Sequence, residues 1–209
     1  MSATAERLAR FRDALTANLA RAHGPLPADG AADLAVELAR ERAGGRAVAV
    51  ATGDPVLAGL DLPGRLAAAG VEVLLPPLGS RGMPGGELVT PTVAEAGSGG
   101  WEAALASAGA GVTGAFAGLA ATGSVGVACG PGAPRAVSLV PPAHVCIVRA
   151  SDVVEDLTEA LRDLIRRGPL PSNLVWVGGP SRSADLEMTL TLGVHGPASV
   201  DVVVVDDAN

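Results

Sequence analysis

A chain of 209 residues is long enough for one α/β domain with a sizeable core. Its formal net charge of −7 and its pI of about 4.9 leave no basic field that would attract nucleic acid or an anionic membrane surface. All 15 basic residues are arginine, and the missing lysine excludes both a Schiff-base lysine and a lysine-containing phosphate loop.

Residues 1–22 predict an amphipathic docking helix. Its apolar side chains recur at helical spacing on one face: Leu8, Phe11, Leu15 and Leu19. No apolar signal core follows, which disfavours a targeting peptide, and no apolar run in the chain approaches the ~20 residues of a membrane span. We expect the apolar face of this helix to be buried on its own domain or on a partner.

Helices and strands then alternate. A proline-broken turn leads into a predicted helix at about 31–42, which ends at the Gly44–Gly45 pair. Short apolar runs at 46–51 and 71–75 predict strands, with a helix at about 60–69 between them. This alternation is typical of a parallel sheet with helical crossovers.

The middle of the chain is richer in glycine and proline. Residues 76–91 predict a long loop, and loops of that length are usually functional or mobile. Residues 92–108 predict a helix, and residues 109–150 predict several short strands joined by glycine turns.

The last third has the clearest periodicity. A helix capped by Ser151 or Asp152 is predicted to run to Arg167. Its expected buried stripe consists of Val154, Leu157, Leu161, Leu164 and Ile165. We then predict a strand at 173–177, followed by a helix at about 183–192. A final strand at 200–205 is rich in valine, as suits a strand covered on both faces.

These elements together predict the α/β class. The expected architecture is an open, doubly wound and mostly parallel sheet. We divide the chain into an N-terminal helical extension over residues 1–45 and one α/β domain over residues 46–209.

The stretch GAGVTG (109–114) matches the glycine pattern of dinucleotide-binding loops. It follows a predicted helix and leads into a strand, which reverses the order that such a loop requires. We therefore interpret it as a helix stop and a turn.

The stretch AATGSVG (120–126) allows two interpretations. Thr122, Gly123 and Ser124 bring hydroxyls and backbone N–H groups together, and such a nest suits a carboxylate or a phosphate. The same residues suit a hairpin turn with Gly123 at positive φ. The sequence supports both interpretations equally.

Histidines and cysteines give weaker signals. Cys129 and Cys146 are the only thiols, too few for a four-thiolate site, so we expect a reduced, cytoplasmic chain with no metal or cofactor of its own. His144 and Cys146 share one face of a predicted strand, but a single pair is weak evidence for metal, and we favour a core histidine bonded to backbone. His195 lies in a loop where a functional and a structural role are equally supported.

The stretch GGPSRSADLE (178–187) is typical of a helix start. Its glycines permit close approach of a ligand or of another backbone, and Ser181 or Ser183 would cap the helix. Arg182 fits less well, because a cation in the first turn opposes the helix dipole. Its anion would be Asp185, or a ligand carboxylate or phosphate at the carboxyl edge of the parallel sheet.

Three of these stretches resemble the lactate utilization protein C family of LUD-domain proteins. They are ATGS (121–124), RAVSLVPPAHVCIV (135–148) and GPSRSADLEMTLTLGVHGP (179–197), and the resemblance covers nearly the whole chain. It implies a NagB/RpiA/CoA-transferase-like fold. It also implies a role in oxidising L-lactate to pyruvate beside two iron–sulfur partner proteins, which would hold the clusters.

The resemblance also implies a set of site residues for a small carboxylate ligand or a partner surface. The candidates are Thr122, Gly123, Ser124, Arg135, Pro141, His144, Gly179, Ser181, Arg182, Asp185, Glu187 and His195. Ala121 stands where the family usually has an acidic residue. If that acid is catalytic or ligand-binding in the family, its role is altered or missing here.

Two other functions fit the sequence. The fold resemblance alone allows an independent enzyme of acyl-CoA or sugar-phosphate chemistry, whose acyl-transferring version needs a carboxylate nucleophile. Glu187 is the nearest candidate, although a place beyond the first turn of a helix makes it a poor nucleophile. The other possibility is a non-catalytic scaffold in which every motif is a turn or a cap.

Overall fold

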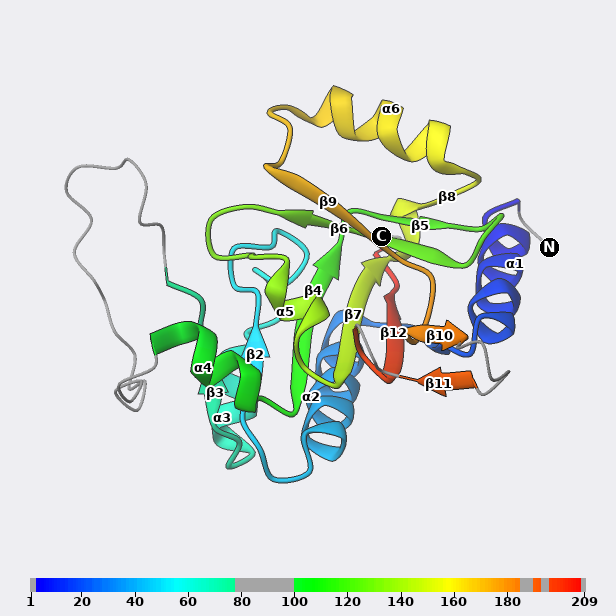
Figure 1. Cartoon of the computed structure of the whole chain (residues 1–209). Coiled ribbons are helices and arrows are strands. Elements are labelled where there is room, and N and C mark those ends of the chain that lie inside the picture. The colour runs from blue at the N-terminus through cyan, green and yellow to red at the C-terminus, as the bar shows by residue number, and fades with distance from the viewer. Residues whose placement is uncertain (1–2, 78–99, 185–189, 193–195, 208–209) are drawn as a thin grey trace.

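A central six-stranded sheet organises the molecule (Figure 1). The computed structural model describes residues 3–77, 100–184, 190–192 and 196–207. Across the sheet the strands are β1 (Arg21–Leu26), β12 (Ser199–Val205), β7 (Ala143–Arg149), β4 (Ala110–Ala115), β2 (Val48–Val50) and β3 (Val73–Leu74). Each strand runs parallel to its neighbours, so long connections must cross over the faces of the sheet.

Helices cover both faces of this sheet (Figure 1). The helices of the structure are α1 (Ala3–Ala17), α2 (Ala28–Ala43), α3 (Leu62–Ala68), α4 (Gly100–Ser107), α5 (Ala136–Leu139) and α6 (Leu157–Arg167), with a 3₁₀ turn, η1, at Ala150–Asp152. On one face, α2 and α3 pack against apolar strand residues such as Val112 and Val203. On the other face, α4 and α5 cover β2 and β3, while α1 and a second sheet cover β7 and β12.

The second sheet was not expected from the sequence. Its strands, in spatial order, are β8 (Val153–Val154), β5 (Ala117–Leu119), β6 (Ser124–Cys129) and β9 (Asn173–Val177). β6 runs antiparallel to both β5 and β9, whereas β8 runs parallel to β5. One face packs with α1 against the main sheet. Helix α6 covers the other face (Figure 1). There Ala160 packs in one cluster with Leu119 and Val154.

The predicted α/β class and parallel sheet are confirmed. The segment 1–45, expected to be helical, also contains β1, which pairs with β12 at one edge of the main sheet. The predicted proline-broken turn is therefore part of a strand. Proline is tolerated there because β1 is an edge strand and has an irregular register between His23 and Leu26.

The predicted N-terminal helix is confirmed as α1, and its apolar face is buried on the chain's own domain. Phe11 and Leu15 are both 0% exposed. The Phe11 ring lies against Gly118, where an added Cβ would come within 2.8 Å of the ring. Leu19, expected on the same face, lies beyond the end of the helix and is exposed.

Two predictions for the C-terminal third are wrong. The strand at 173–177 exists as β9, but it pairs antiparallel with β6 in the second sheet instead of joining the parallel sheet. The helix expected at about 183–192 is contradicted by an antiparallel pair, β10 (Arg182–Ala184) and β11 (Leu190–Leu192). The alternation of threonine and leucine in TLTL (189–192) has the period of a strand, and it outweighs the cap-like residues before it.

Helix α6 is confirmed, but it begins later than predicted. Asp156 caps it by accepting a hydrogen bond from the backbone N–H of Glu159 at 2.9 Å, whereas the expected caps, Ser151 and Asp152, both lie in η1. Ala160 and Leu164 are buried, as a core-facing stripe requires. Leu157 and Ile165, expected in that stripe, are 45% and 66% exposed.

Parts of two predicted elements lie outside the described residues. These are most of the loop predicted at 76–91 and the first half of the helix predicted at 92–108, of which α4 forms the second half. Within the described ranges, no helix is both long enough and apolar enough to cross a membrane.

Candidate functional site

The motif ATGS forms a tight hairpin between β5 and β6. Gly123 has φ +63°, and an added Cβ would come within 2.4 Å of the backbone of Ala14 and Leu15 in α1. The N–H groups of Thr122 and Gly123 both donate to the carbonyl oxygen of Leu119, at 3.3 and 2.8 Å. The hairpin interpretation is therefore confirmed, and these two N–H groups already have acceptors within the chain.

The glycine pair of GGPSR lies beside this hairpin. An added Cβ at Gly178 would be 3.4 Å from the Ser124 hydroxyl oxygen, and one at Gly179 would be 2.3 Å from the carbonyl oxygen of Asn18. Asn18 Nδ2 donates to the carbonyl oxygen of Thr122 at 2.7 Å, and Thr122 Oγ1 donates to Ser124 Oγ at 3.1 Å. The structure thus brings two motifs together at the end of α1. We call these five residues the hairpin cluster.

The stretch after the glycine pair runs toward the start of β12. The Ser181 N–H donates to the carbonyl oxygen of Pro197 at 2.8 Å. Arg182 begins β10 and not a helix, so the expected conflict between its charge and a helix dipole does not arise. Three further candidates lie outside the described residues: Asp185, Glu187 and His195.

The candidates from RAVSLVPPAHVCIV lie apart from the hairpin cluster. Arg135 is an exposed residue at the start of α5, and Pro141 is buried just before β7. His144 is 1% exposed in β7, with Nε2 2.8 Å from Thr113 Oγ1, so its partner is a side-chain hydroxyl and not the expected backbone group. Thr113 Oγ1 also lies 3.7 Å from the sulfur of Cys146.

The buried histidine and thiol are both electrically neutral near pH 7. Burial lowers the pKa of His144 to about 4 and raises the pKa of Cys146 to about 12. A thiol with so high a pKa is a poor nucleophile. In the part of the chain that the structure describes, no group of three or more His, Cys, Asp and Glu residues could hold a metal ion.

The glycines of GAGVTG serve packing. An added Cβ at Gly109 would come within 2.3 Å of the Ala43 carbonyl oxygen in α2, and one at Gly111 within 1.9 Å of the Val137 carbonyl oxygen in α5. The motif leads from α4 into β4, in the order predicted from the sequence. These glycines therefore let two helices approach the strand closely.

A second polar region, missed in the sequence, lies at the carboxyl ends of the parallel strands. Asp54 follows β2, is 4% exposed and accepts a hydrogen bond from the Val56 N–H at 2.8 Å. Burial raises the pKa of Asp54 to about 6. Arg149, the last residue of β7, lines a cavity of about 540 Å³ with the Asp206–Asp207 pair and the start of α2. Charged residues directly after strands were the sequence signal for this region.

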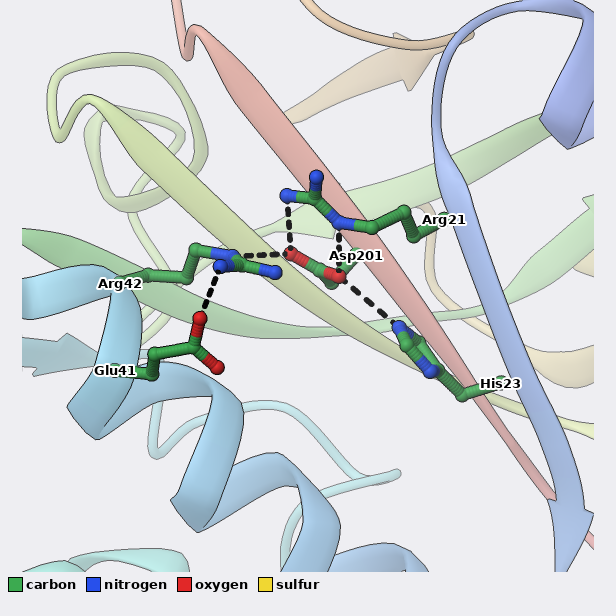
Figure 2. A network of polar contacts seen from close by, with 5 residues as sticks. All are labelled: Arg21, His23, Glu41, Arg42 and Asp201. Atoms are coloured by element: carbon green, nitrogen blue, oxygen red, sulfur yellow. Dashed lines mark hydrogen bonds and ion pairs between the residues drawn. The ribbon is translucent and has the colours of Figure 1, made fainter.

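Asp201, the third residue of β12, is also a buried charge, and no sequence motif marked it. Its carboxylate is 0% exposed and accepts hydrogen bonds from Arg21 Nε at 2.8 Å and Arg42 Nε at 3.0 Å, with His23 Nε2 at 3.0 Å (Figure 2). Burial alone would raise the pKa of Asp201, but these hydrogen bonds outweigh it and hold the pKa well below its usual range. The network ties β1 and α2 to β12.

The sequence matches one protein family and several known proteins. A family model described as the LUD domain matches residues 8–205. The chain is 42% identical to lactate utilization protein C of Shouchella clausii over 92 residues, which are 43% of this chain and 40% of that protein. It is 38% identical to lactate utilization protein C of Bacillus subtilis over 94 residues, 43% of this chain and 39% of that protein.

A further relative and one solved structure are also similar to the chain. An uncharacterized protein of Neisseria meningitidis is 36% identical over 98 residues, 46% of this chain and 42% of that protein. The matched stretches therefore span only about two fifths of the curated relatives. The crystal structure of a DUF162 family protein from Deinococcus radiodurans matches with a TM-score of 0.59 and 25% identity, over 98% of this chain and 99% of that chain. The two chains share the overall fold.

Proposed function

Because the chain belongs to the LUD domain family, we propose that it is a subunit of a cytoplasmic lactate utilization system that supports the oxidation of L-lactate to pyruvate. The observation that carries the proposal is the family match over residues 8–205, together with relatives named lactate utilization protein C. Two iron–sulfur proteins would be its partners and would hold the clusters. This division of roles is consistent with the chain's two cysteines, Cys129 and Cys146, which are both buried.

We further propose that a small carboxylate binds beside the hairpin cluster. The support is that the Ser124 hydroxyl lies against Gly178 and is bonded to the Thr122 hydroxyl, and that Arg182 follows the glycine pair closely in the chain. A guanidinium and hydroxyls are suitable donors for a carboxylate. Ala121 is exposed at the same hairpin, where the family usually has an acidic residue. This chain therefore has one negative charge fewer at the hairpin, which reduces the repulsion of a bound anion.

Growth on L-lactate as sole carbon source tests the function. A strain lacking the gene is expected not to grow, and the wild-type gene is expected to restore growth. Purification of a tagged chain is expected to bring down the iron–sulfur partners and lactate-dependent oxidase activity. Normal growth of the deletion strain would overturn the proposed function. A covalent adduct after incubation with an acyl-CoA, seen by mass spectrometry, would favour the acyl-transfer alternative.

Substitutions at Arg182 test the ligand site separately. Arg182→Ala should remove charge-assisted hydrogen bonds worth about 1.5–3 kcal/mol of ligand binding, and Arg182→Lys should also be impaired because lysine lacks the bidentate fork. Arg40→Ala, at an exposed position of α2, is the control. Full complementation by Arg182→Ala, in a strain that needs the wild-type gene, would overturn the ligand site but not the function.

A further inference from the structure

A cavity of about 540 Å³ opens at the carboxyl ends of β7 and β12. The start of α2 and the turn that follows β2 complete its wall. Its volume falls within the ~300–1,000 Å³ of clefts that bind small organic ligands, and open α/β folds commonly bind such ligands at the carboxyl edge of the sheet. Among the described residues, its lining shares no member with the hairpin cluster, so the cavity is a separate candidate site.

The lining of the cavity combines apolar side chains with charges of both signs. Its apolar side chains are those of Pro27, Ala28, Val56, Leu60 and Val205, and its charged side chains are those of Arg149, Asp206 and Asp207. A ligand that fits this lining needs an aliphatic part, together with groups that pair with a guanidinium and with a carboxylate.

Arg149 is the cation of the cavity lining. It is the last residue of β7 and is half-buried, and its Nη2 donates to the carbonyl oxygen of Pro55 at 3.2 Å. This bond anchors the guanidinium and uses one of its five N–H groups. The remaining N–H groups suit a carboxylate, which a guanidinium can bind through two parallel hydrogen bonds.

Asp207 is an acid that the chain holds in place beside this cation. Its Oδ1 accepts the Ser151 N–H at 3.0 Å, and its Oδ2 accepts the Ser151 hydroxyl at 2.5 Å. Partial burial would raise the pKa of Asp207, but the hydrogen bonds from Ser151 and the nearby charge of Arg149 outweigh it and lower the pKa. The carboxylate is therefore charged at neutral pH, and each of its oxygens can accept a further hydrogen bond.

We propose that this cavity binds an α-amino acid with an aliphatic side chain, in its zwitterionic form. Arg149 binds the carboxylate of the amino acid, Asp207 binds the ammonium group, and Val56 and Leu60 contact the aliphatic side chain. An amino acid carries both charged groups on one carbon atom, which matches a cation and an acid held close together at one edge of the sheet.

The charge of the lining favours a zwitterion over a simple carboxylate. One guanidinium and two carboxylates give the lining a net charge of −1. A fatty acid or a 2-hydroxy acid is a net anion at neutral pH, so the excess acid repels it. A zwitterion is neutral overall and places its ammonium group beside the acids. This site is therefore independent of the carboxylate site proposed at the hairpin cluster.

Calorimetric titration of the full chain with L-leucine and its analogues tests the ligand class. L-Leucine is expected to bind in a saturable way. 4-Methylpentanoate, 2-hydroxy-4-methylpentanoate and 3-methylbutylamine each lack one charged group, and each is expected to bind about tenfold or more weakly. Glycine, which lacks the side chain, is also expected to bind more weakly. Binding of 2-hydroxy-4-methylpentanoate as tightly as L-leucine, or no binding of L-leucine, L-valine, L-isoleucine or L-phenylalanine, would overturn the proposal.

Two substitutions test the residues assigned to the ligand. Arg149→Met keeps much of the length of the side chain but removes its charge, and Asp207→Asn removes a charge at nearly constant volume. Each is expected to raise the Kd for L-leucine by about tenfold or more. Arg40→Met, at an exposed position near the other end of α2, is the control and should leave the Kd unchanged. Melting curves identify any variant that fails to fold. Wild-type affinity for L-leucine in a folded Asp207→Asn or Arg149→Met variant would overturn the assignment.

Discussion

Replacing Asp201 by asparagine should destabilise the fold substantially while preserving the volume of the side chain. The carboxylate is 0% exposed, whereas the side chains of its partners Arg21 and Arg42 are 49% and 21% exposed. Breaking a buried pair by removing one partner costs ~3–5 kcal/mol, and we expect about 3 kcal/mol because both arginines can turn toward water. For a chain of this size that loss corresponds to a melting temperature about 6–12 °C lower.

The effect of Asp201→Asn should depend on pH in a defined direction. Because the folded chain holds the pKa of Asp201 below the unfolded value of about 3.9, the carboxylate stabilises the fold above that pH. Its contribution is lost as the pH falls further, through the folded-state pKa. The stabilities of wild type and variant should therefore converge in strong acid.

Thermal unfolding followed by circular dichroism provides the assay. Asp33→Asn is a matched control, because Asp33 forms an ion pair with Arg65 at 2.7 Å but has a 73% exposed side chain. We expect the control to melt close to the wild type, since exposed ion pairs contribute little. An Asp201→Asn variant that melts with the wild type at neutral pH would refute the role given to the buried network.

Three further substitutions test packing and burial. Gly123→Ala should destabilise the fold more than Gly44→Ala, as measured by urea unfolding. Both glycines have a left-handed φ, +63° and +58°, which costs alanine ~1 kcal/mol or more of backbone strain. Only at Gly123 does backbone lie within 2.4 Å of an added Cβ. Equal losses would contradict the close approach of α1. Phe11→Ala should lower the free energy of unfolding by about 3–5 kcal/mol, because the ring is 0% exposed. Removal of residues 1–22, which include this ring, should therefore unfold the domain. A truncated domain that keeps the wild-type melting temperature would contradict this. Burial raises the pKa of Asp54 to about 6, from about 3.9 in the unfolded chain, so the stability of the fold should decrease as the pH rises from about 4 through 6. Asp54→Asn should remove this pH dependence of the melting temperature, measured by thermal unfolding at several pH values. An unchanged pH dependence would rule out this titration.

The amino-acid sequence by itself determined the elements with strong local signals. Alternating apolar runs and helical patterns predicted α2, β2, α3 and β3, and the valine-rich run near the C-terminus predicted β12. The spacing of Phe11 and Leu15 predicted that they share a buried face. At the candidate site, Gly123 marked a hairpin turn, because a left-handed φ is a local requirement that favours glycine. Each of these signals depends on residues only a few positions apart.

Only the tertiary structure decided which surface covers each buried face. Periodicity indicates that a strand has an apolar side, but not that β9 pairs with β6 in a second sheet. The partners of Asp201 are 180 and 159 residues away in the chain, so no local pattern could assign Arg21 and Arg42 to it. The hairpin cluster likewise joins Asn18, Thr122 and Gly179 through contacts between distant segments. Such contacts form because burying a charge or an apolar face requires a partner, and the chain topology selects that partner.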